Sequence, residues 1–157
     1  ASSGDWIGTP IPITPLKGQI LRLSVDSISF DFTIHHRGNY AGLKPDGLLW
    51  IGTTEENVGF DTQTTKAGKK QILETVSEFL PVVNNGDLVQ QTACLRPASS
   101  DGLPILGPVP SWDGVYISTG TRREGILLSP SIAKANFDLI TTGQTELPID
   151  IFTLARF

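Results

Sequence analysis

The chain has 157 residues, of which 39% are hydrophobic, and its 12 basic and 16 acidic residues leave a formal net charge of −4. These totals fit one globular domain with a core and exclude a disordered chain, and no apolar run approaches the roughly 20 residues that cross a bilayer. The acidic balance argues against a nucleic-acid-binding protein. A single cysteine, Cys94, excludes an internal disulfide and a cysteine-based metal site, and it favours a cytoplasmic location.

The beginning of the sequence predicts an extended segment. Residues 1–15 include Pro10, Pro12 and Pro15, which disfavour a helix there. The sequence starts at Ala1 and contains no methionine, so we expect a processed protein or a fragment of a longer one.

The first half of the chain has the residue patterns of strands. Alternating or continuous apolar residues predict strands at residues 19–25, 28–34, 40–43 and 48–52. The turn Asp26–Ser27 predicts that the first two strands pair as a hairpin, and the turn Lys44–Gly47 separates the last two.

The second half of the chain adds two predicted helices. Residues 66–80 carry apolar side chains on one face, with Thr64 or Thr65 as the cap and Pro81 at the end. Residues 129–142 form the second helix, with Pro130 in its first turn and Gly143 beyond its end. Its predicted inward positions are Ile132, Ala135, Leu139 and Ile140.

Between the helices, residues 88–95 predict a strand that ends at Arg96, and residues 115–118 predict a buried strand. Residues 97–110 predict a packed loop with a short strand at Ile105–Leu106, and the tail, residues 149–157, is expected to dock on the body. The whole pattern predicts an α+β fold with a mixed, mostly antiparallel sheet and two main helices.

The segment from Leu95 to Pro130 combines features of an anion-binding site. It holds Arg96 and Arg123 and the Gly-bounded turn from Gly120 to Gly125, which leads into a helix. The first N–H groups of a helix lack intrahelical acceptors, and the helix dipole directs its positive end toward them. The segment therefore predicts a site for a small anionic ligand.

Several motifs, in order along the chain, resemble the C-terminal part of the FAD-dependent D-amino acid oxidase superfamily, and its glycine-oxidase and sarcosine-oxidase-like branch in particular. They are PITPLKGQILRL, DGLLWIGTTEENVGFD, LRPASSDGLPILGPVP, GTRREGILLSPSIAK and a closing ARF. The resemblance covers essentially the whole chain and implies the substrate-domain part of a D-amino acid oxidase-like fold.

The resemblance implies an oxidoreductase with FAD as cofactor. Its members oxidise glycine, sarcosine or D-amino acids to imino acids and release hydrogen peroxide, while the flavin carries the chemistry and the protein orients the substrate. The G-x-G-x-x-G turn of the FAD-binding half does not occur in residues 1–157. We therefore expect residues 1–157 to be the C-terminal fragment, which needs an N-terminal FAD-binding domain and is inactive alone. A homo-oligomer is left open.

The resemblance also implies roles for particular residues. Arg96 corresponds to the arginine that clamps the substrate carboxylate, a role that suits its planar, permanently charged group. Tyr40 corresponds to a tyrosine of the substrate pocket, and Arg123 to the arginine of a G-H-x-R-N-G turn. The alternatives are a salt-bridged arginine, a packed tyrosine and an exposed charged turn.

The turn and the helix start correspond to the cradle of the flavin ring, with main-chain N–H groups as the contacts. The predicted cofactor-binding residues are Thr121, Arg122, Arg123, Glu124, Gly125, Ile126 and Leu127. Thr121 stands where the family has a histidine, and Glu124 stands where it has an asparagine. A carboxylate near an anionic reduced flavin is unfavourable unless it points away or pairs with an arginine.

The remaining candidate residues predict no chemistry. Adjacent strand residues point to opposite faces, so His35 and His36 do not meet at one centre, and no carboxylate cluster supports a metal. Cys94 is interpreted as a small buried hydrophobe, and the pair Glu55–Glu56 as a loop cap. Two alternatives to an oxidase fragment are a non-catalytic subunit of the same ancestry and a carboxylate-binding module that uses Arg96 and Arg123.

Overall fold

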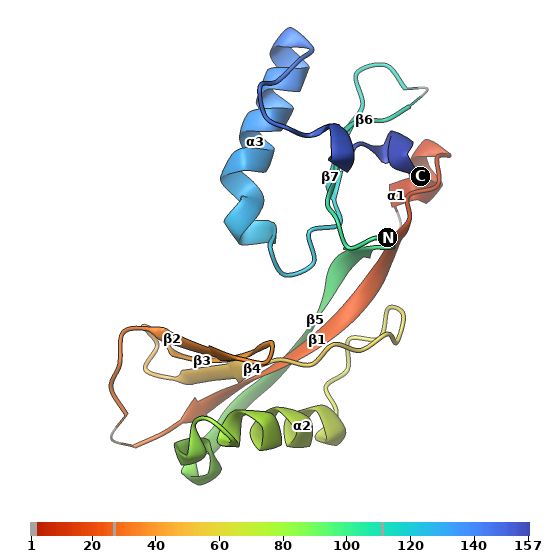
Figure 1. Cartoon of the computed structure of the whole chain (residues 1–157). Coiled ribbons are helices and arrows are strands. Elements are labelled where there is room, and N and C mark those ends of the chain that lie inside the picture. The colour runs from red at the N-terminus through yellow and green to blue at the C-terminus, as the bar shows by residue number, and fades with distance from the viewer. Residues whose placement is uncertain (1–2, 27, 111) are drawn as a thin grey trace. The chain divides into compact units, whose positions relative to one another are not determined.

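The computed structural model describes residues 3–26, 28–110 and 112–157 (Figure 1). They divide into two compact units. The sheet unit is Lys17–Leu95, and the terminal unit combines Ala1–Leu16 with Arg96–Phe157. The predicted α+β class with a mostly antiparallel sheet is confirmed. No helix in the described part of the chain is long and apolar enough to cross a membrane.

The sheet unit is built on a five-stranded sheet in the order β2-β3-β4-β1-β5. Strand β4 pairs antiparallel with both β1 and β3, and β2 pairs antiparallel with β3. Its long strands, β1 and β5, continue along the chain into the terminal unit. The bounds are Ile13–Ser24 for β1, Thr33–His36 for β2, Asn39–Leu43 for β3, Leu49–Gly52 for β4 and Asp87–Ser99 for β5.

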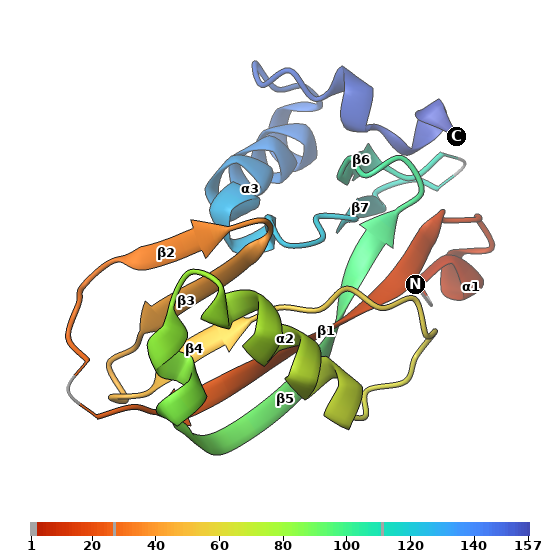
Figure 2. The same cartoon turned by 60° about the horizontal axis from the view of Figure 1, so that its bottom comes forward.

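Helix α2, Lys66–Ser77, lies along one face of this sheet (Figure 2). The hydroxyl of Thr65 accepts a hydrogen bond from the N–H of Gly68, which confirms the predicted cap. The predicted apolar face is confirmed as well, because Ile72 and Val76 are fully buried. They pack with inward side chains of the sheet, Leu21, Leu23, Ala41, Leu49 and Ile51, and a 3₁₀ helix, Pro81–Asn85, follows.

The terminal unit combines a two-stranded hairpin with helix α3, Gly125–Thr142. The phenol of Tyr116 donates to the carbonyl of Leu139 over 3.2 Å and ties the hairpin to the helix. Leu154 is buried in a small core with Ile13, Ile105 and Val109, so the predicted docking of the tail is confirmed at this residue. The other bounds are Ser3–Ile7 for α1, Ile105–Pro108 for β6, Tyr116–Thr119 for β7, and Asp150–Phe152 and Leu154–Arg156 for two 3₁₀ helices.

Two predictions for the start of the chain are wrong. Helix α1 occupies part of the segment expected to be extended, because the prolines begin only at residue 10 and Gly8, with φ 61°, follows the helix. The predicted hairpin of residues 19–25 and 28–34 does not form. Strand β1 starts at Ile13 and has β4 and β5 as neighbours, so β2 pairs with β3 instead. Ser27 of the predicted turn lies outside the described residues.

Later elements need smaller corrections. Arg96 lies within β5, which continues to Ser99, instead of at a strand end. Strand β7 is half-buried, and Cys94 is exposed where a buried side chain was predicted. Helix α3 begins at Gly125, four residues early, so Pro130 lies inside it, and Ile140 is 61% exposed instead of inward.

Candidate functional site

The main chain brings the Arg96 segment and the Gly120–Gly125 turn together within the terminal unit. The N–H of Arg122 donates to the carbonyl of Pro97 over 3.0 Å, and Ala98 forms an antiparallel bridge with Thr121. Two segments that are distant in sequence, each carrying a candidate arginine, are therefore adjacent along their backbones.

The turn has a tight, partly left-handed backbone. Gly120 has φ 77° and Arg122 has φ 48°, and the N–H of Glu124 donates to the carbonyl of Thr121 over 2.8 Å. A Cβ on Gly120 would lie 3.2 Å from the Ile13 side chain and 3.3 Å from the Leu103 carbonyl. The turn is therefore compact enough to require glycine at this position.

Substitution of Gly120 separates crowding from backbone strain, because Gly114 offers a matched control. Gly114 has φ 70°, but a Cβ there would meet nothing within 4 Å. We expect Gly114→Ala to lower the free energy of unfolding by about 1 kcal/mol and Gly120→Ala by roughly 2–3 kcal/mol. Urea unfolding of both variants measures the difference, and equal losses would contradict the close packing of the turn.

The first turn of α3 exposes main-chain donors. The first intrahelical bond runs from the N–H of Leu128 to the carbonyl of Glu124 over 2.8 Å, so the N–H groups of Gly125, Ile126 and Leu127 precede the helical ladder. The Glu124 side chain does not cap them. Ile126 is 91% exposed and Leu127 75% exposed. This end of α3 combines three donors with an apolar surface.

Tyr40 belongs to the other unit. It lies on β3, opposite His35 on β2 and Gly52 on β4. Its ring centroid lies 6.3 Å from that of His35, and a Cβ on Gly52 would lie 3.4 Å from its Cε1 atom. The ring therefore packs over a glycine. The ring centroid of His36 lies 5.4 Å from that of Phe79, so the two histidines face different neighbours, as predicted.

A buried ionic network in the sheet unit was missed from the sequence. Lys17 on β1 is 1% exposed, and its Nζ lies 2.8 Å from Asp61 Oδ2 and 3.3 Å from Glu56 Oε2. The same ammonium donates to the carbonyl of Gln63 over 3.1 Å. Glu56 Oε1 also accepts from Gln19 Nε2 over 2.7 Å and from the hydroxyl of Thr54. The network fastens the irregular segment after β4 to the sheet.

These contacts set the protonation of the network. Burial of Glu56 raises its pKa, but hydrogen bonds from Thr54, Gln19 and Lys17 outweigh that effect and hold the pKa below its usual value. The hydrogen bond from Lys17 likewise lowers the pKa of Asp61, and the bond to Asp61 raises the pKa of Lys17. The sequence did carry a signal, because Lys17 and Gln19 continue the inward alternation of Leu21 and Leu23.

A second ionic contact, between Arg156 and Asp101, lies in the loop that packs beside the turn. Arg156, in the closing ARF motif, donates through Nε to Asp101 Oδ2 over 2.7 Å and through Nη2 to Asp101 Oδ1 over 3.1 Å. Its Nη2 also donates to the carbonyl of Leu103, which a side chain at Gly120 would contact. The hydrogen bond from Arg156 holds the pKa of Asp101 well below its usual range. The motif therefore anchors the loop beside the turn.

The lowered pKa of Asp101 predicts that the stability of the fold decreases at acidic pH. Because its pKa is lower in the folded than in the unfolded chain, its stabilisation is present above about pH 4 and is lost as the pH falls toward the folded value. We expect the thermal midpoint of the wild type to fall more steeply from about pH 5 to about pH 2 than that of Asp101→Asn. Calorimetry across this range tests the difference, and parallel curves would rule it out.

The part of the chain that the structure describes contains no candidate metal centre. Among residues 3–26, 28–110 and 112–157, no group of three or more His, Cys, Asp or Glu side chains could hold a metal ion. The donors at the start of α3, next to Arg123 and the Arg96 segment, are the part of the described chain best suited to a ligand with partial negative charge.

Comparison with known proteins gives consistent matches along the chain. The model of the family described as FAD dependent oxidoreductase matches residues 1–139. Glycine oxidase of Pseudomonas aeruginosa is 33% identical over 147 residues, which cover 89% of this chain and 40% of that protein. A hydrogen cyanide synthase subunit, HcnC, of the same species is 34% identical over 152 residues, which cover 96% of this chain and 36% of the subunit.

The fold has a close counterpart among solved structures. The crystal structure of glycine oxidase from Geobacillus kaustophilus superimposes with a TM-score of 0.89 at 28% identity, over 98% of this chain and 42% of that one. The chain thus spans about 40% of the length of the relatives it matches.

Proposed function

The chain belongs to the FAD-dependent oxidoreductase family, and from that premise we propose that it is the substrate-binding and flavin-contacting part of an amine oxidase. The proposed enzyme oxidises glycine, sarcosine or D-amino acids to imino acids with release of hydrogen peroxide. Similarity to glycine oxidases in sequence and in fold supports this substrate class. We also propose a cytoplasmic location.

The observation that carries the proposal is the uncapped start of α3. The N–H groups of Gly125, Ile126 and Leu127 precede the helical ladder, beside exposed apolar side chains. A flavin ring has a polar pyrimidine edge on a flat apolar body, so donors beside an apolar surface fit that group. These residues would hold the ring, and FAD, when bound, supplies hydride acceptance and the passage of electrons to dioxygen.

Arg96 is the residue that we propose binds the substrate carboxylate. A guanidinium matches a carboxylate with two parallel hydrogen bonds and keeps its charge at every working pH. Tyr40 and Arg123 are proposed as further substrate contacts, from the resemblance of their positions. Orientation of the amino acid by such contacts lowers the entropic part of the barrier without an acid or base from the protein.

The turn residues Thr121 to Glu124 are proposed to complete the cradle around the ring. Glu124 directly precedes α3, where its negative charge interacts favourably with the positive end of the helix dipole. The same charge disfavours a negatively charged reduced flavin. We therefore expect Glu124 to make reduction of the flavin less favourable than an asparagine at this position would.

The test uses the purified chain, alone and with the part of the Pseudomonas aeruginosa glycine oxidase that lies outside the matched stretch. The proposal expects flavin absorbance and peroxide release with glycine, sarcosine or D-alanine only in the combined sample. Flavin held by the chain alone would contradict the need for a separate FAD-binding domain. Flavin held by the combined sample without peroxide from any of the three substrates would overturn the proposed activity.

A non-catalytic subunit is the second candidate, and the similarity to a subunit of hydrogen cyanide synthase supports only its assembly with other chains. In that case the chain would assemble with a separate flavin-binding chain and would support no turnover by itself. A carboxylate-binding module is the third. If the chain is such a module, we expect acetate or glycine to bind it without flavin. Isothermal titration calorimetry measures this binding.

A further inference from the structure

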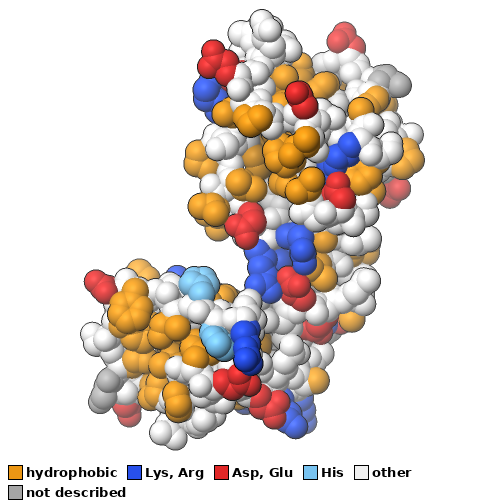
Figure 3. All heavy atoms as spheres, in the orientation of Figure 1, with side chains coloured by type: hydrophobic (Ala, Val, Ile, Leu, Met, Phe, Trp, Pro, Cys, Tyr) orange, Lys and Arg blue, Asp and Glu red, His pale blue; other side chains and the backbone are white. Residues whose placement is uncertain are grey.

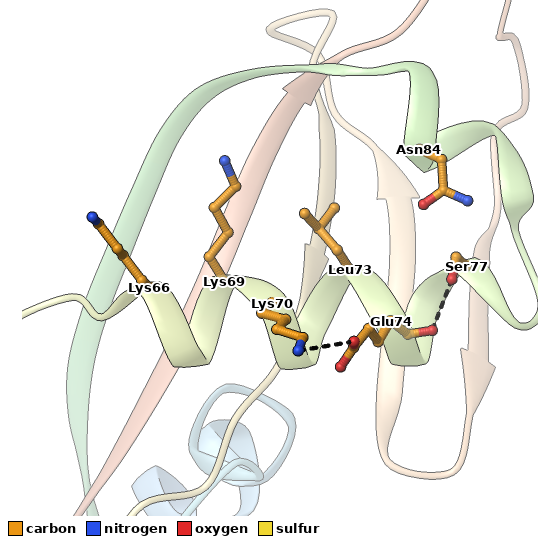
Figure 4. Close-up of a pocket in the computed structure, with 7 residues that line it drawn as sticks. All are labelled: Lys66, Lys69, Lys70, Leu73, Glu74, Ser77 and Asn84. Atoms are coloured by element: carbon orange, nitrogen blue, oxygen red, sulfur yellow. Dashed lines mark hydrogen bonds and ion pairs between the residues drawn. The ribbon is translucent and has the colours of Figure 1, made fainter.

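Helix α2 carries a charged ridge along its outer side. The ridge consists of Lys66, Lys70, Glu74 and the C-cap residue Glu78, which recur every four residues and are all exposed. It is centred opposite Ile72, which is fully buried against the sheet. Figure 4 shows Lys66, Lys70 and Glu74 in this order along the helix, and Figure 3 shows basic and acidic side chains at the surface in the region of α2.

The order of the charges along the ridge is unfavourable for the helix by itself. Acidic residues stabilise the first turn of a helix and basic residues the last turn, because of the helix dipole. Helix α2 has no acidic residue in its first turn and no basic residue in its last turn. Lys70 and Glu74, whose charged atoms lie 3.7 Å apart, also stand in the less favourable order for such a pair. Arg37 lies 3.5 Å from Glu78 and offsets one of these charges, so the helix alone does not explain the pattern.

The same order of charges is complementary to itself when it is reversed. A two-fold axis between Lys70 and Glu74 would set Lys70 of one copy against Glu74 of the other, and Lys66 against Glu78. Every charge of the ridge then meets an opposite charge, and the two helix dipoles are antiparallel. Ridges of residues four positions apart are also those that interlock in the commonest class of helix packing. The ridge therefore fits an antiparallel copy of itself in both charge and shape.

The position of α2 leaves the proposed substrate side of the sheet free. Ala41 is fully buried in one cluster with Ile72 and Val76, so its side chain points toward α2. Its neighbour Tyr40 points to the opposite face, because successive strand residues alternate. A copy that docks on the outer side of α2 therefore does not cover the face that carries Tyr40.

We propose that the charged ridge of α2 is the docking surface for a second copy of this chain, in a two-fold symmetric dimer. Helix α2 has 12 residues and is about 18 Å long, which is too short to bury the roughly 1,000 Å² of a stable interface. The dimer is therefore weak and reversible. Its contacts join exposed charges, so salt weakens it further.

The test measures the dissociation constant of the dimer by sedimentation of the purified chain at low salt. One variant combines Lys66→Glu with Lys70→Glu, and the other combines Glu74→Lys with Glu78→Lys. Each variant alone makes every facing pair like-charged, so we expect its dissociation constant to rise at least roughly tenfold. An equal mixture of the two variants restores opposite charges in every pair, and it should form a heterodimer with about the dissociation constant of the wild type.

The variant with all four substitutions is the matched control. It reverses the whole ridge and stays complementary to itself, so it should dimerise like the wild type but not with the wild type. Its charges also suit the helix dipole, so it should unfold at a slightly higher urea concentration. Urea unfolding checks that each variant folds, because all four side chains are exposed. A wild type that is monomeric up to about 1 mM, a dimer that both double variants keep, or a mixture that stays monomeric would overturn the proposal.

Discussion

Replacing Arg96 with alanine is expected to raise the KM for a carboxylate substrate by about a hundredfold to a thousandfold in the assembled enzyme. A bidentate, charge-assisted pair is lost, which corresponds to about 3–4 kcal/mol of binding. Steady-state kinetics with glycine at fixed dioxygen measures this change, and we expect kcat at saturating glycine to change far less.

The conservative variant sharpens the assignment of Arg96. Arg96→Lys keeps the charge but loses the planar fork, so it should recover only part of the affinity. Thermal unfolding of both variants serves as the control, because a clamp residue acts on substrate and not on folding. Unchanged KM in Arg96→Ala would show that the guanidinium does not bind the carboxylate.

Replacing Glu56 with alanine is expected to lower the free energy of unfolding by about 3 kcal/mol. The change leaves the buried ammonium of Lys17 with one carboxylate fewer, and it removes one of the two side-chain oxygens that accept hydrogen bonds from Gln19 Nε2, the other being the hydroxyl of Thr65. Urea unfolding measures the loss. The matched control is Glu74→Ala on the exposed side of α2, whose contact with Lys70 at 3.7 Å should contribute less than about 0.5 kcal/mol.

A double variant distinguishes a broken network from a simple loss of packing. Lys17→Met combined with Glu56→Leu removes both buried charges and keeps apolar volume, so it should be more stable than Glu56→Ala alone. A double variant that is less stable than Glu56→Ala would mean that the network contributes net stability through its remaining bonds. In that case Asp61 and Gln63 would be left unsatisfied at a larger cost than expected.

Local patterns predicted the elements whose signals are contained in a short stretch. Helix α2 followed from its 3.6-residue apolar period, with Thr65 as the cap, and the β3–β4 hairpin followed from Lys44–Gly47. The hairpin expected for residues 19–34 was wrong. Patterns of apolar residues locate the strands but do not say which strand pairs with β1, whose neighbours are β4 and β5. Ile140 was assigned inward for a similar reason, since α3 has two apolar faces and the pattern does not rank them.

Composition, periodicity and ordered motifs by themselves determined the α+β class, the family resemblance and the candidate residues, because these signals depend on nearest neighbours along the chain. Only the tertiary structure decided that Arg122 donates to Pro97, that Lys17 is buried between Asp61 and Glu56, and that Arg156 pairs with Asp101. Each of these contacts joins residues at least 25 positions apart, and their geometry depends on how whole strands and loops pack. The same packing leaves one apolar face of α3 exposed, which the amphipathic pattern of the helix did not reveal.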